Sequence, residues 1–234
     1  MKILIAVIAY NEELNIRDTL KNLHGNNFGF DVIVIDDGST DRTFEICREA
    51  GFPVLRHCIN SGSFGAVKTY FLYAYLNGYD VLCQFDGDGQ HSASELPKIL
   101  SPIQKNEADY VIGSRFIAKQ GFQSSSLRRV GIRLFSLLNS KIIGQRITDS
   151  TSGFRAYNRK MIELFSKTYR HEIHDTIQLL LLAHYNGGRI AEVPVAMRPR
   201  KYGVSEYNAI NSVVFLMKGL VNILGSVLQR RQFR

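Results

Sequence analysis

The chain has 234 residues, of which 45% are hydrophobic and 21% are charged, and its formal net charge is +8. This composition is typical of a globular protein with a substantial core, in one large domain or two small ones. The three cysteines, Cys47, Cys58 and Cys83, have neither paired nor metal-type spacing, which argues against a disulfide framework and a cysteine-based metal site and favours a cytoplasmic protein with reduced thiols.

The first half of the chain alternates β-rich apolar runs with helical segments. Residues 2–8 form too short a run for a signal peptide and lack a small-residue cleavage site, so they are interpreted as a strand. Asn11 is expected to cap the following helix. Further strands are expected at 31–35, 53–57, 79–83 and 109–113. Further helices are expected at 41–50, from the turn at 60–66 through residue 76, and at 94–105. This alternation predicts an α/β fold with a mostly parallel, doubly wound sheet and helices on both faces.

The second half is less regular. A loop containing glycine and serine precedes a helix at 127–143, and a polar loop from residue 147 leads into a short strand. A helix at 174–186 and a strand at 189–195 follow. Basic residues cluster at Arg128-Arg129, 198–201 and 230–234. A basic chain can bind nucleic acid, an anionic membrane surface or a phosphorylated substrate.

Residues 209–228 form a second predicted unit, after a domain covering 1–208. Their apolar side chains recur at steps of three and four, which indicates one face of a helix, and a basic tail follows to residue 234. Such a helix lies on an anionic membrane, packs against a partner protein or docks on its own domain. A membrane-crossing helix is disfavoured because Lys218 would lie in mid-bilayer at a cost of a few kcal/mol.

Asp86-Gly87-Asp88, after the strand at 79–83, is the central motif. Two carboxylates between glycines suit a divalent cation whose remaining ligands are phosphate oxygens and water. An EF-hand is excluded, because His91 and Pro97 occupy the positions that need Gly and Glu. Alone, the motif also fits an ordinary acidic turn at a strand end.

Three polar strand ends are expected at one edge of the sheet. Residues 9–12 follow the first strand, 36–39 the second, and 86–88 the fourth. Ligands of doubly wound sheets bind beyond the carboxyl ends of the strands. The three segments together therefore predict a nucleotide site.

Eight short motifs, in order over about 200 residues, resemble family-2 glycosyltransferases, in particular the polyprenyl-phosphate branch. They are Ala9-Tyr10-Asn11-Glu12, Asp36-Asp37-Gly38-Ser39-Thr40-Asp41, Asn60-x-Gly62-x-x-Gly65-Ala66, Asp86-Gly87-Asp88-Gly89-Gln90-His91, Gly113-Ser114-Arg115-Phe116, Ser152-Gly153-Phe154-Arg155-Ala156-Tyr157, Glu192-Val193-Pro194-Val195 and Arg200-x-x-Gly203-x-Ser205. The resemblance implies a GT-A fold, a nucleotide-diphosphate sugar donor, inversion at the anomeric carbon, and Mg²⁺ or Mn²⁺.

The resemblance also implies roles for single residues. The donor would be held by Ala9, Tyr10, Glu12, Asp37, Gly65, Asp86 and Gly87, and the metal by Asp88, Gln90 and Asp86. Asp149 is the candidate catalytic residue, as a general base or as a group that orients an acceptor phosphate; a loop-capping aspartate is the alternative. Candidates for acceptor or phosphate binding are Arg115, Arg128, Arg155, Arg200, Lys201 and Ser205.

The chain departs from the family at Phe64 and Tyr70, where relatives often have glycine, and at Gln178, where they often carry a carboxylate. The expected function is transfer of a hexose from a UDP- or GDP-sugar to a polyprenyl phosphate. The alternatives are transfer to a sugar hydroxyl of a lipid-linked or surface polysaccharide, and a non-catalytic scaffold that binds a membrane partner. The expected place is the inner face of the plasma membrane; nucleic acid is not an expected partner, and homo-oligomerisation is left open.

Overall fold

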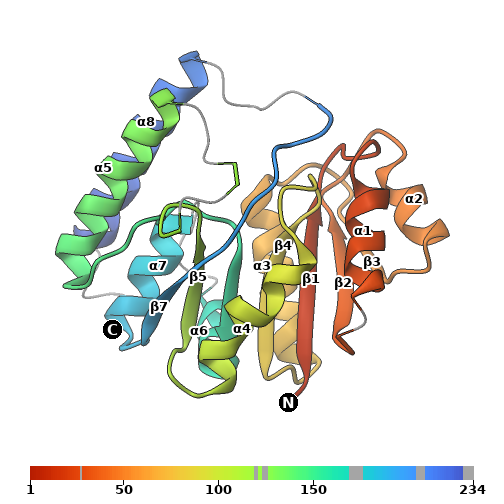
Figure 1. Cartoon of the computed structure of the whole chain (residues 1–234), viewed down its shortest axis with the longest axis horizontal. Coiled ribbons are helices and arrows are strands. Elements are labelled where there is room, and N and C mark those ends of the chain that lie inside the picture. Colours follow the sequence, from red (N-terminus) through yellow and green to blue (C-terminus); the bar gives the residue numbers. More distant parts are fainter. Residues whose placement is uncertain (27, 119–120, 123–125, 169–175, 204–208, 229–234) are drawn as a thin grey trace.

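The computed structural model of the chain describes residues 1–26, 28–118, 121–122, 126–168, 176–203 and 209–228 (Figure 1). These residues form a seven-stranded sheet in the order β3-β2-β1-β4-β6-β5-β7. The strands are β1 (Ile3–Ala9), β2 (Asp31–Asp36), β3 (Val54–Arg56), β4 (Val81–Asp86), β5 (Tyr110–Ser114), β6 (Arg155–Asn158) and β7 (Ile190–Pro194). Only β6 runs antiparallel to its neighbours, β4 and β5. The predicted mostly parallel sheet is confirmed.

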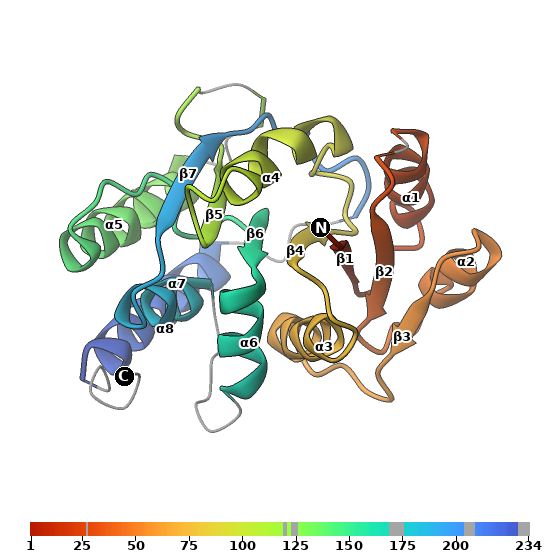
Figure 2. The same cartoon turned by 90° about the horizontal axis from the view of Figure 1, so that it is seen from below.

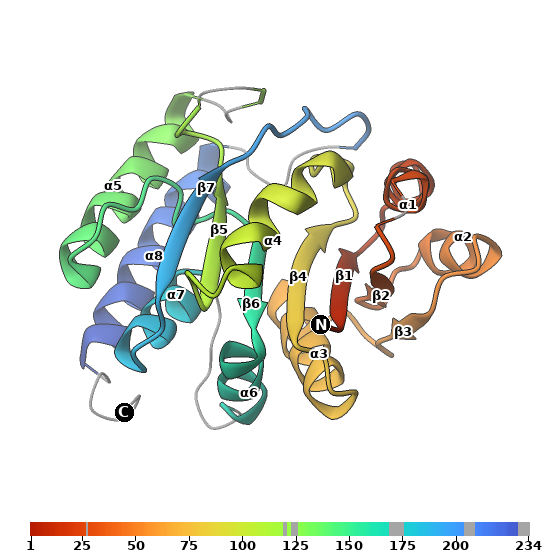
Figure 3. The same cartoon turned by 60° about the horizontal axis from the view of Figure 1, so that its bottom comes forward.

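Helices cover both faces of the sheet (Figures 2 and 3). Leu4 and Ala6 of β1 pack with α3 (Ser63–Leu76), α6 (Arg159–Lys167) and α7 (Thr176–Tyr185). Ile5 and Val7 pack with α1 (Ile16–Gly25), α2 (Thr43–Glu49) and α4 (Leu96–Gln104), which follows a short turn of 3-10 helix at Ala93–Glu95. A strand buried on both faces needs a continuous apolar run, which is what residues 3–9 supply.

Two local predictions were incomplete or wrong. Helix α6 was missed, although Asn158 caps it by accepting the N–H of Met161 at 3.1 Å and its apolar residues recur at helical spacing. Asn11 does not cap α1. Its φ is +52°, its side-chain oxygen accepts the N–H of Thr40 at 2.9 Å, and α1 begins only at Ile16. The asparagine side chain therefore links the loop after β1 to the loop after β2 and does not start a helix.

Helix α8 (Ala209–Leu228) lies beside α5 (Ser126–Ile143) and also packs on α7 (Figure 1). Its Ile223 is buried with Phe135 of α5 and Leu181 of α7. Among the described residues, no helix has the length and apolarity needed to cross a bilayer. The contacts of α8 with α5 and α7 show that this helix packs on the rest of the chain. The tail from residue 229 onwards lies outside the described residues.

Gly219→Ala is expected to weaken the docking of α8. An added methyl group would lie 2.3 Å from the ring of Phe135, which is fully buried. Overpacking costs about 1–3 kcal/mol, against a gain of about 1 kcal/mol from removing a helical glycine. The free energy of unfolding in urea should therefore fall. Gly225→Ala is the matched control, because nothing lies within 4 Å of its added methyl group, and it should raise stability. Equal effects of the two changes would contradict this packing.

Candidate active site

The polar strand ends meet at one edge of the sheet, as predicted. In the parallel registers, Ala9 of β1 lies opposite Asp36 of β2, and Ile8 lies opposite Asp86 of β4. Since β6 is antiparallel, the loop that precedes Arg155 reaches the same edge. The segment after β7 crosses over this edge towards α1, where the carbonyl of Tyr202 accepts a hydrogen bond from Asn15 (Figure 1).

The Asp86-Gly87-Asp88 turn follows directly from β4. Gly87 donates its N–H to the carbonyl of Ile8 at 2.8 Å, and a Cβ at Gly87 would lie 2.9 Å from that oxygen. The glycine is thus required by the close approach of β1. The carboxylate of Asp88 accepts the N–H of Gln90 at 3.0 Å, which fixes the turn.

The electrostatics of this turn suit a cation. Burial raises the pKa of Asp86, against the effects of a hydrogen bond from Gln84 and the charges of Arg115 and Arg155. Burial, and next the charge of Asp86, raise the pKa of Asp88. A divalent cation relieves such repulsion. Among the described residues no group of three His, Cys, Asp or Glu side chains is placed to hold a metal, so the two carboxylates would leave most of the shell to other ligands.

Gln90 and His91 flank the turn. The side-chain amide of Gln90 points to the carbonyl of Arg198 at 3.5 Å. His91 accepts the backbone N–H of Asp86 on Nδ1 at 3.0 Å, and its ring stacks on Phe154 at 4.5 Å. Burial lowers the pKa of His91 to about 4, so the ring is neutral at pH 7, as an acceptor nitrogen requires.

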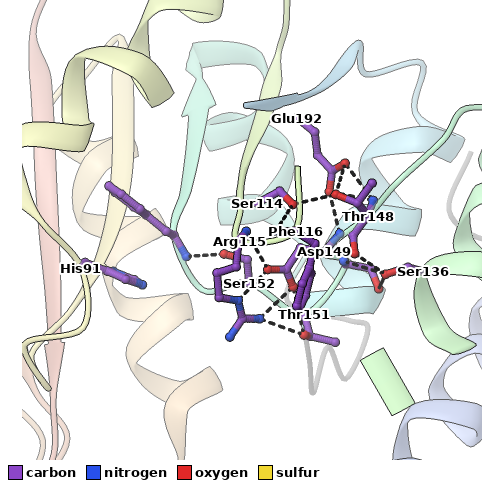
Figure 4. A network of polar contacts seen from close by, with 12 residues as sticks. His91, Ser114, Arg115, Phe116, Ser136, Thr148, Asp149, Thr151, Ser152 and Glu192 are labelled. Carbon is purple, nitrogen blue, oxygen red and sulfur yellow. Dashed lines mark hydrogen bonds and ion pairs between the residues drawn. The ribbon is translucent and has the colours of Figure 1, made fainter. Parts of the chain in front are cut away.

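Asp149 and Arg115 form a buried ion pair (Figure 4). Nε of Arg115 lies 2.7 Å from Oδ2 of Asp149, and Nη2 lies 2.8 Å from Oδ1. Asp149 is fully buried, and its own N–H donates to Glu192 at 2.7 Å. Both carboxylate oxygens are therefore bound to one guanidinium, an arrangement that holds Arg115 in place. The assignment of Asp149 as the catalytic residue stays a prediction.

Arg155 lies fully buried below this loop. Its guanidinium donates to the carbonyls of Ser150 at 2.6 Å, Ser152 at 2.5 Å and Thr176 at 2.6 Å, and also contacts the hydroxyl of Tyr110. Arg155 thus holds the loop before β6 in place, because its guanidinium N–H groups, which a phosphate would need as donors, are bound to these backbone carbonyls.

Of the other residues expected at the donor, Ala9, Tyr10 and Asp37 lie at the ends of β1 and β2, and Gly65 lies near the start of α3. Asp37 is 2% exposed, and its Oδ1 accepts from His57 at 2.7 Å and from the hydroxyl of Ser61 at 2.5 Å. A Cβ at Gly65 would lie 1.9 Å from that hydroxyl oxygen, so the glycine makes room for Ser61. Ala9 is buried and its carbonyl accepts the N–H of Asp37, whereas Tyr10 is 38% exposed.

Arg200 joins Glu12 to the acidic turn. Its Nη2 donates to Glu12 at 2.8 Å, and its Nη1 lies 4.0 Å from Asp88. Burial raises the pKa of Glu12, against hydrogen bonds from Asn15 and Arg200. Lys201 points away, to Asp18 at 3.4 Å. The side chain of Arg128 and the whole of Ser205 lie outside the described residues.

A cavity of about 720 Å³ opens between α5 and the loop before Asp149. Phe116 and Thr148, the chain neighbours of Arg115 and Asp149, are among its lining residues. Arg129, Arg133, Lys141 and Arg146 are also among its lining residues. Sequence reasoning assigned no role to these four residues. The i, i+4 spacing of Arg129 and Arg133 on a predicted helix was the available signal.

A family model described as "Glycosyl transferase family 2" matches residues 4–165. An undecaprenyl-phosphate mannosyltransferase of Micrococcus luteus is 31% identical over 218 residues, with 88% of this chain and 87% of that protein covered. A UDP-N-acetylglucosamine–dolichyl-phosphate N-acetylglucosaminyltransferase of Methanococcus voltae is 30% identical over 222 residues, with 87% and 88% covered.

The fold is also that of a solved glycosyltransferase. Glucosyl-3-phosphoglycerate synthase from Mycobacterium tuberculosis, in complex with Mn²⁺, UDP-glucose and phosphoglyceric acid, superposes with a TM-score of 0.76 at 18% identity, and 96% of this chain and 79% of that chain are covered. At this identity the likeness bears on the fold alone. By its sequence match and its sheet, the chain belongs to glycosyl transferase family 2 and has the GT-A fold.

Proposed function

We propose that this enzyme transfers a hexose, with inversion, from a UDP- or GDP-sugar to the phosphate of a polyprenyl phosphate. One observation carries the proposal: an acidic turn fit for a cation and a buried, fixed arginine lie at the same edge of the sheet. The two relatives named for undecaprenyl-phosphate and dolichyl-phosphate transfer support this acceptor class.

The acidic turn would hold the donor through Mg²⁺ or Mn²⁺. Asp86 and Asp88 supply hard oxygen ligands, and Gln90 is the third candidate. When bound, the metal neutralises charge on the nucleoside diphosphate as it leaves. Glu12 and Tyr10, at the end of β1, would contact the nucleoside. The hydrogen bonds of Asp37 and the close approach of Ser61 to Gly65 favour a supporting role for both residues in shaping this end of the site.

Arg115 would bind the acceptor phosphate. A phosphate oxygen forms the new bond to the anomeric carbon, while the bond to the diphosphate breaks and its electron pair leaves with the nucleoside diphosphate. A phosphate monoester is largely ionised at pH 7, so this attack needs no strong general base. Asp149 then acts by fixing the guanidinium of Arg115. The basic lining of the cavity beside α5 favours a phosphate over the neutral sugar hydroxyl of the alternative function.

We propose that α5 and α8 lie against an anionic membrane, on its cytoplasmic side. The two helices are neighbours, and each exposes an apolar stripe. The exposed residues are Val130, Leu134 and Leu137 on α5, and Met217, Val221, Leu224 and Leu228 on α8. Arg133, Lys141 and Lys218 are exposed on the same helices, which is the composition of an interfacial surface. A lipid acceptor would then reach the cavity beside α5 from the membrane.

The deciding experiment offers radiolabelled UDP- and GDP-sugars with undecaprenyl phosphate and Mn²⁺. We expect label in the lipid with one nucleotide class, and loss of transfer when EDTA removes the metal. Undecaprenol is the matched control, since it lacks only the phosphate and should accept no sugar. Equal transfer to both lipids would contradict a phosphate acceptor, and absence of binding to UDP and to GDP in calorimetry would contradict the donor.

Flotation with vesicles tests the membrane surface. Val221→Ser with Leu224→Ser, two side chains that are 62% and 63% exposed, should reduce binding to vesicles rich in anionic lipid without unfolding the protein. Each exposed apolar side chain contributes about 1 kcal/mol or more to membrane binding, so a tenfold or larger drop is expected. Leu76→Ser, at a 70% exposed position of α3, is the control and should bind as the parent does. A result in which all three proteins float alike would refute the assignment of this surface.

A further inference from the structure

A buried polar side chain interrupts the apolar strand β4. Val81, Leu82, Cys83 and Phe85 are fully buried and apolar, whereas Gln84, between them, is a carboxamide that is only 6% exposed. Burying an amide costs several kcal/mol unless its hydrogen bonds are made. The position therefore needs a reason beyond packing.

Gln84 makes its bonds to Tyr70 and Asp86. The hydroxyl of Tyr70 donates to Oε1 of Gln84 at 2.9 Å, and Nε2 of Gln84 donates to Oδ1 of Asp86 at 3.3 Å. The orientation of the amide follows from chemistry, because a carboxylate only accepts and must face the NH₂ group. Tyr70 is completely buried, and the centre of its ring lies 4.7 Å from that of Phe71.

The carboxylate of Asp86 is confined on its other side as well. Nε2 of His91 lies 3.5 Å from Oδ2 of Asp86. A Cβ at Gly153 would lie 2.8 Å from the same oxygen and 3.2 Å from Nε2 of Gln84. The two oxygens of Asp86 thus face different partners, and the backbone of Gly153 lies against the carboxylate. The Asp86 side chain is still 36% exposed, which leaves part of the carboxylate open to a ligand. The side chain has little freedom to rotate.

We propose that Tyr70 and Gln84 are positioning residues that set the orientation of the Asp86 carboxylate towards the metal-bound diphosphate. The inference rests on the proposed function. The buried hydroxyl of Tyr70, on α3, orients the amide of Gln84, and this amide in turn orients the carboxylate of Asp86. A ligand held in its binding geometry before the metal arrives loses less conformational entropy on binding, so it binds more tightly.

The relay of hydrogen bonds from Tyr70 through Gln84 to Asp86 can be tested with Tyr70→Phe and Gln84→Met. Each substitution keeps the approximate volume of the side chain and removes its hydrogen bonds. Mn²⁺ binding in the presence of the nucleoside diphosphate, followed by the electron paramagnetic resonance of free Mn²⁺, should weaken threefold to tenfold in each. The double variant should be no weaker than Gln84→Met alone, because the hydroxyl acts only through the amide. In turnover assays, the Mn²⁺ concentration for half-activation should rise, while kcat at saturating Mn²⁺ is recovered.

Tyr75→Phe on the same helix is the matched control and should bind Mn²⁺ as the parent does. Melting temperatures measured without metal show whether folding changes in any variant. Unchanged Mn²⁺ affinity in Tyr70→Phe, or losses that multiply in the double variant, would overturn the relay. Failure of the parent protein itself to bind Mn²⁺ with UDP or GDP would instead overturn the proposed metal-dependent function, so the two failures are distinct.

Discussion

Asp88→Asn is expected to reduce turnover by a factor of about a hundred to a thousand, the usual effect of removing one preorganised electrostatic group. The same change should leave the fold as stable as before or more stable. Burial and the charge of Asp86 raise the pKa of Asp88, which means that the folded state disfavours this negative charge. Removing the charge therefore relieves the fold while it weakens the cation site.

Paired measurements of turnover and of the free energy of unfolding test this prediction. Mn²⁺-dependent binding of the nucleoside diphosphate should be lost with Asp88→Asn. Glu107→Gln, which removes a carboxylate at an exposed position after α4, is the control and should leave turnover and binding unchanged. A large loss of stability in Asp88→Asn would contradict the electrostatic account, and full turnover would remove Asp88 from the mechanism.

Asp149→Asn should destabilise the protein by about 3–5 kcal/mol, because it leaves the buried guanidinium of Arg115 without its carboxylate. If Asp149 acts through Arg115, the KM for the polyprenyl phosphate should rise strongly while kcat changes little. A high acceptor concentration should then recover much of the reaction rate. A general base behaves differently, since its loss lowers kcat itself, so that the rate stays low at every acceptor concentration. The ratio of the two effects separates these roles.

A double variant and a pH profile sharpen the test. Arg115→Met with Asp149→Leu replaces the ion pair by apolar groups and should recover most of the stability but none of the acceptor binding. The acidic limb of the rate profile should lie near the second pKa of the acceptor phosphate, at about pH 6, in both the parent and Asp149→Asn. A limb that disappears in Asp149→Asn would show that Asp149 itself takes up the proton.

The sheet edge was predictable because its geometry follows from the chain order. Residues 9–12, 36–39 and 86–88 each end a parallel strand, and parallel strands bring their carboxyl ends together. Glycine at positions 65 and 87 was also recognisable, although the close neighbour is the protein's own Ser61 or Ile8. Spacing along the chain gives the motif but leaves open what each glycine makes room for.

The partners of the charged residues were not predictable. Arg115 and Asp149 are 34 positions apart, and only the antiparallel insertion of β6 brings the loop of Asp149 to the end of β5. Arg155 was expected to bind phosphate because arginines often do, but its burial below the loop assigns it to backbone carbonyls. In the sequence, Tyr70 was visible only as a departure from the glycine that the family resemblance led us to expect. The sequence does not reveal its partner, Gln84, because only the fold brings Tyr70 of α3 within hydrogen-bonding distance of β4.

The place of β6 in the sheet also bears on how the chain is made. Strands β1 to β4 complete their mutual pairing once residue 86 has been synthesised, whereas β5 pairs only with β6 and β7, which are synthesised later. At 5–20 residues per second, the stretch from Asp86 to Arg155 takes about 3–14 s. Throughout that interval the nascent chain presents the open edge of β4, and once Ser114 has been added it also carries an unpaired β5. Such edges are templates for aggregation. We therefore expect ribosome-bound chains that end between Ser114 and Arg155 to be the stage most prone to aggregation through strand edges.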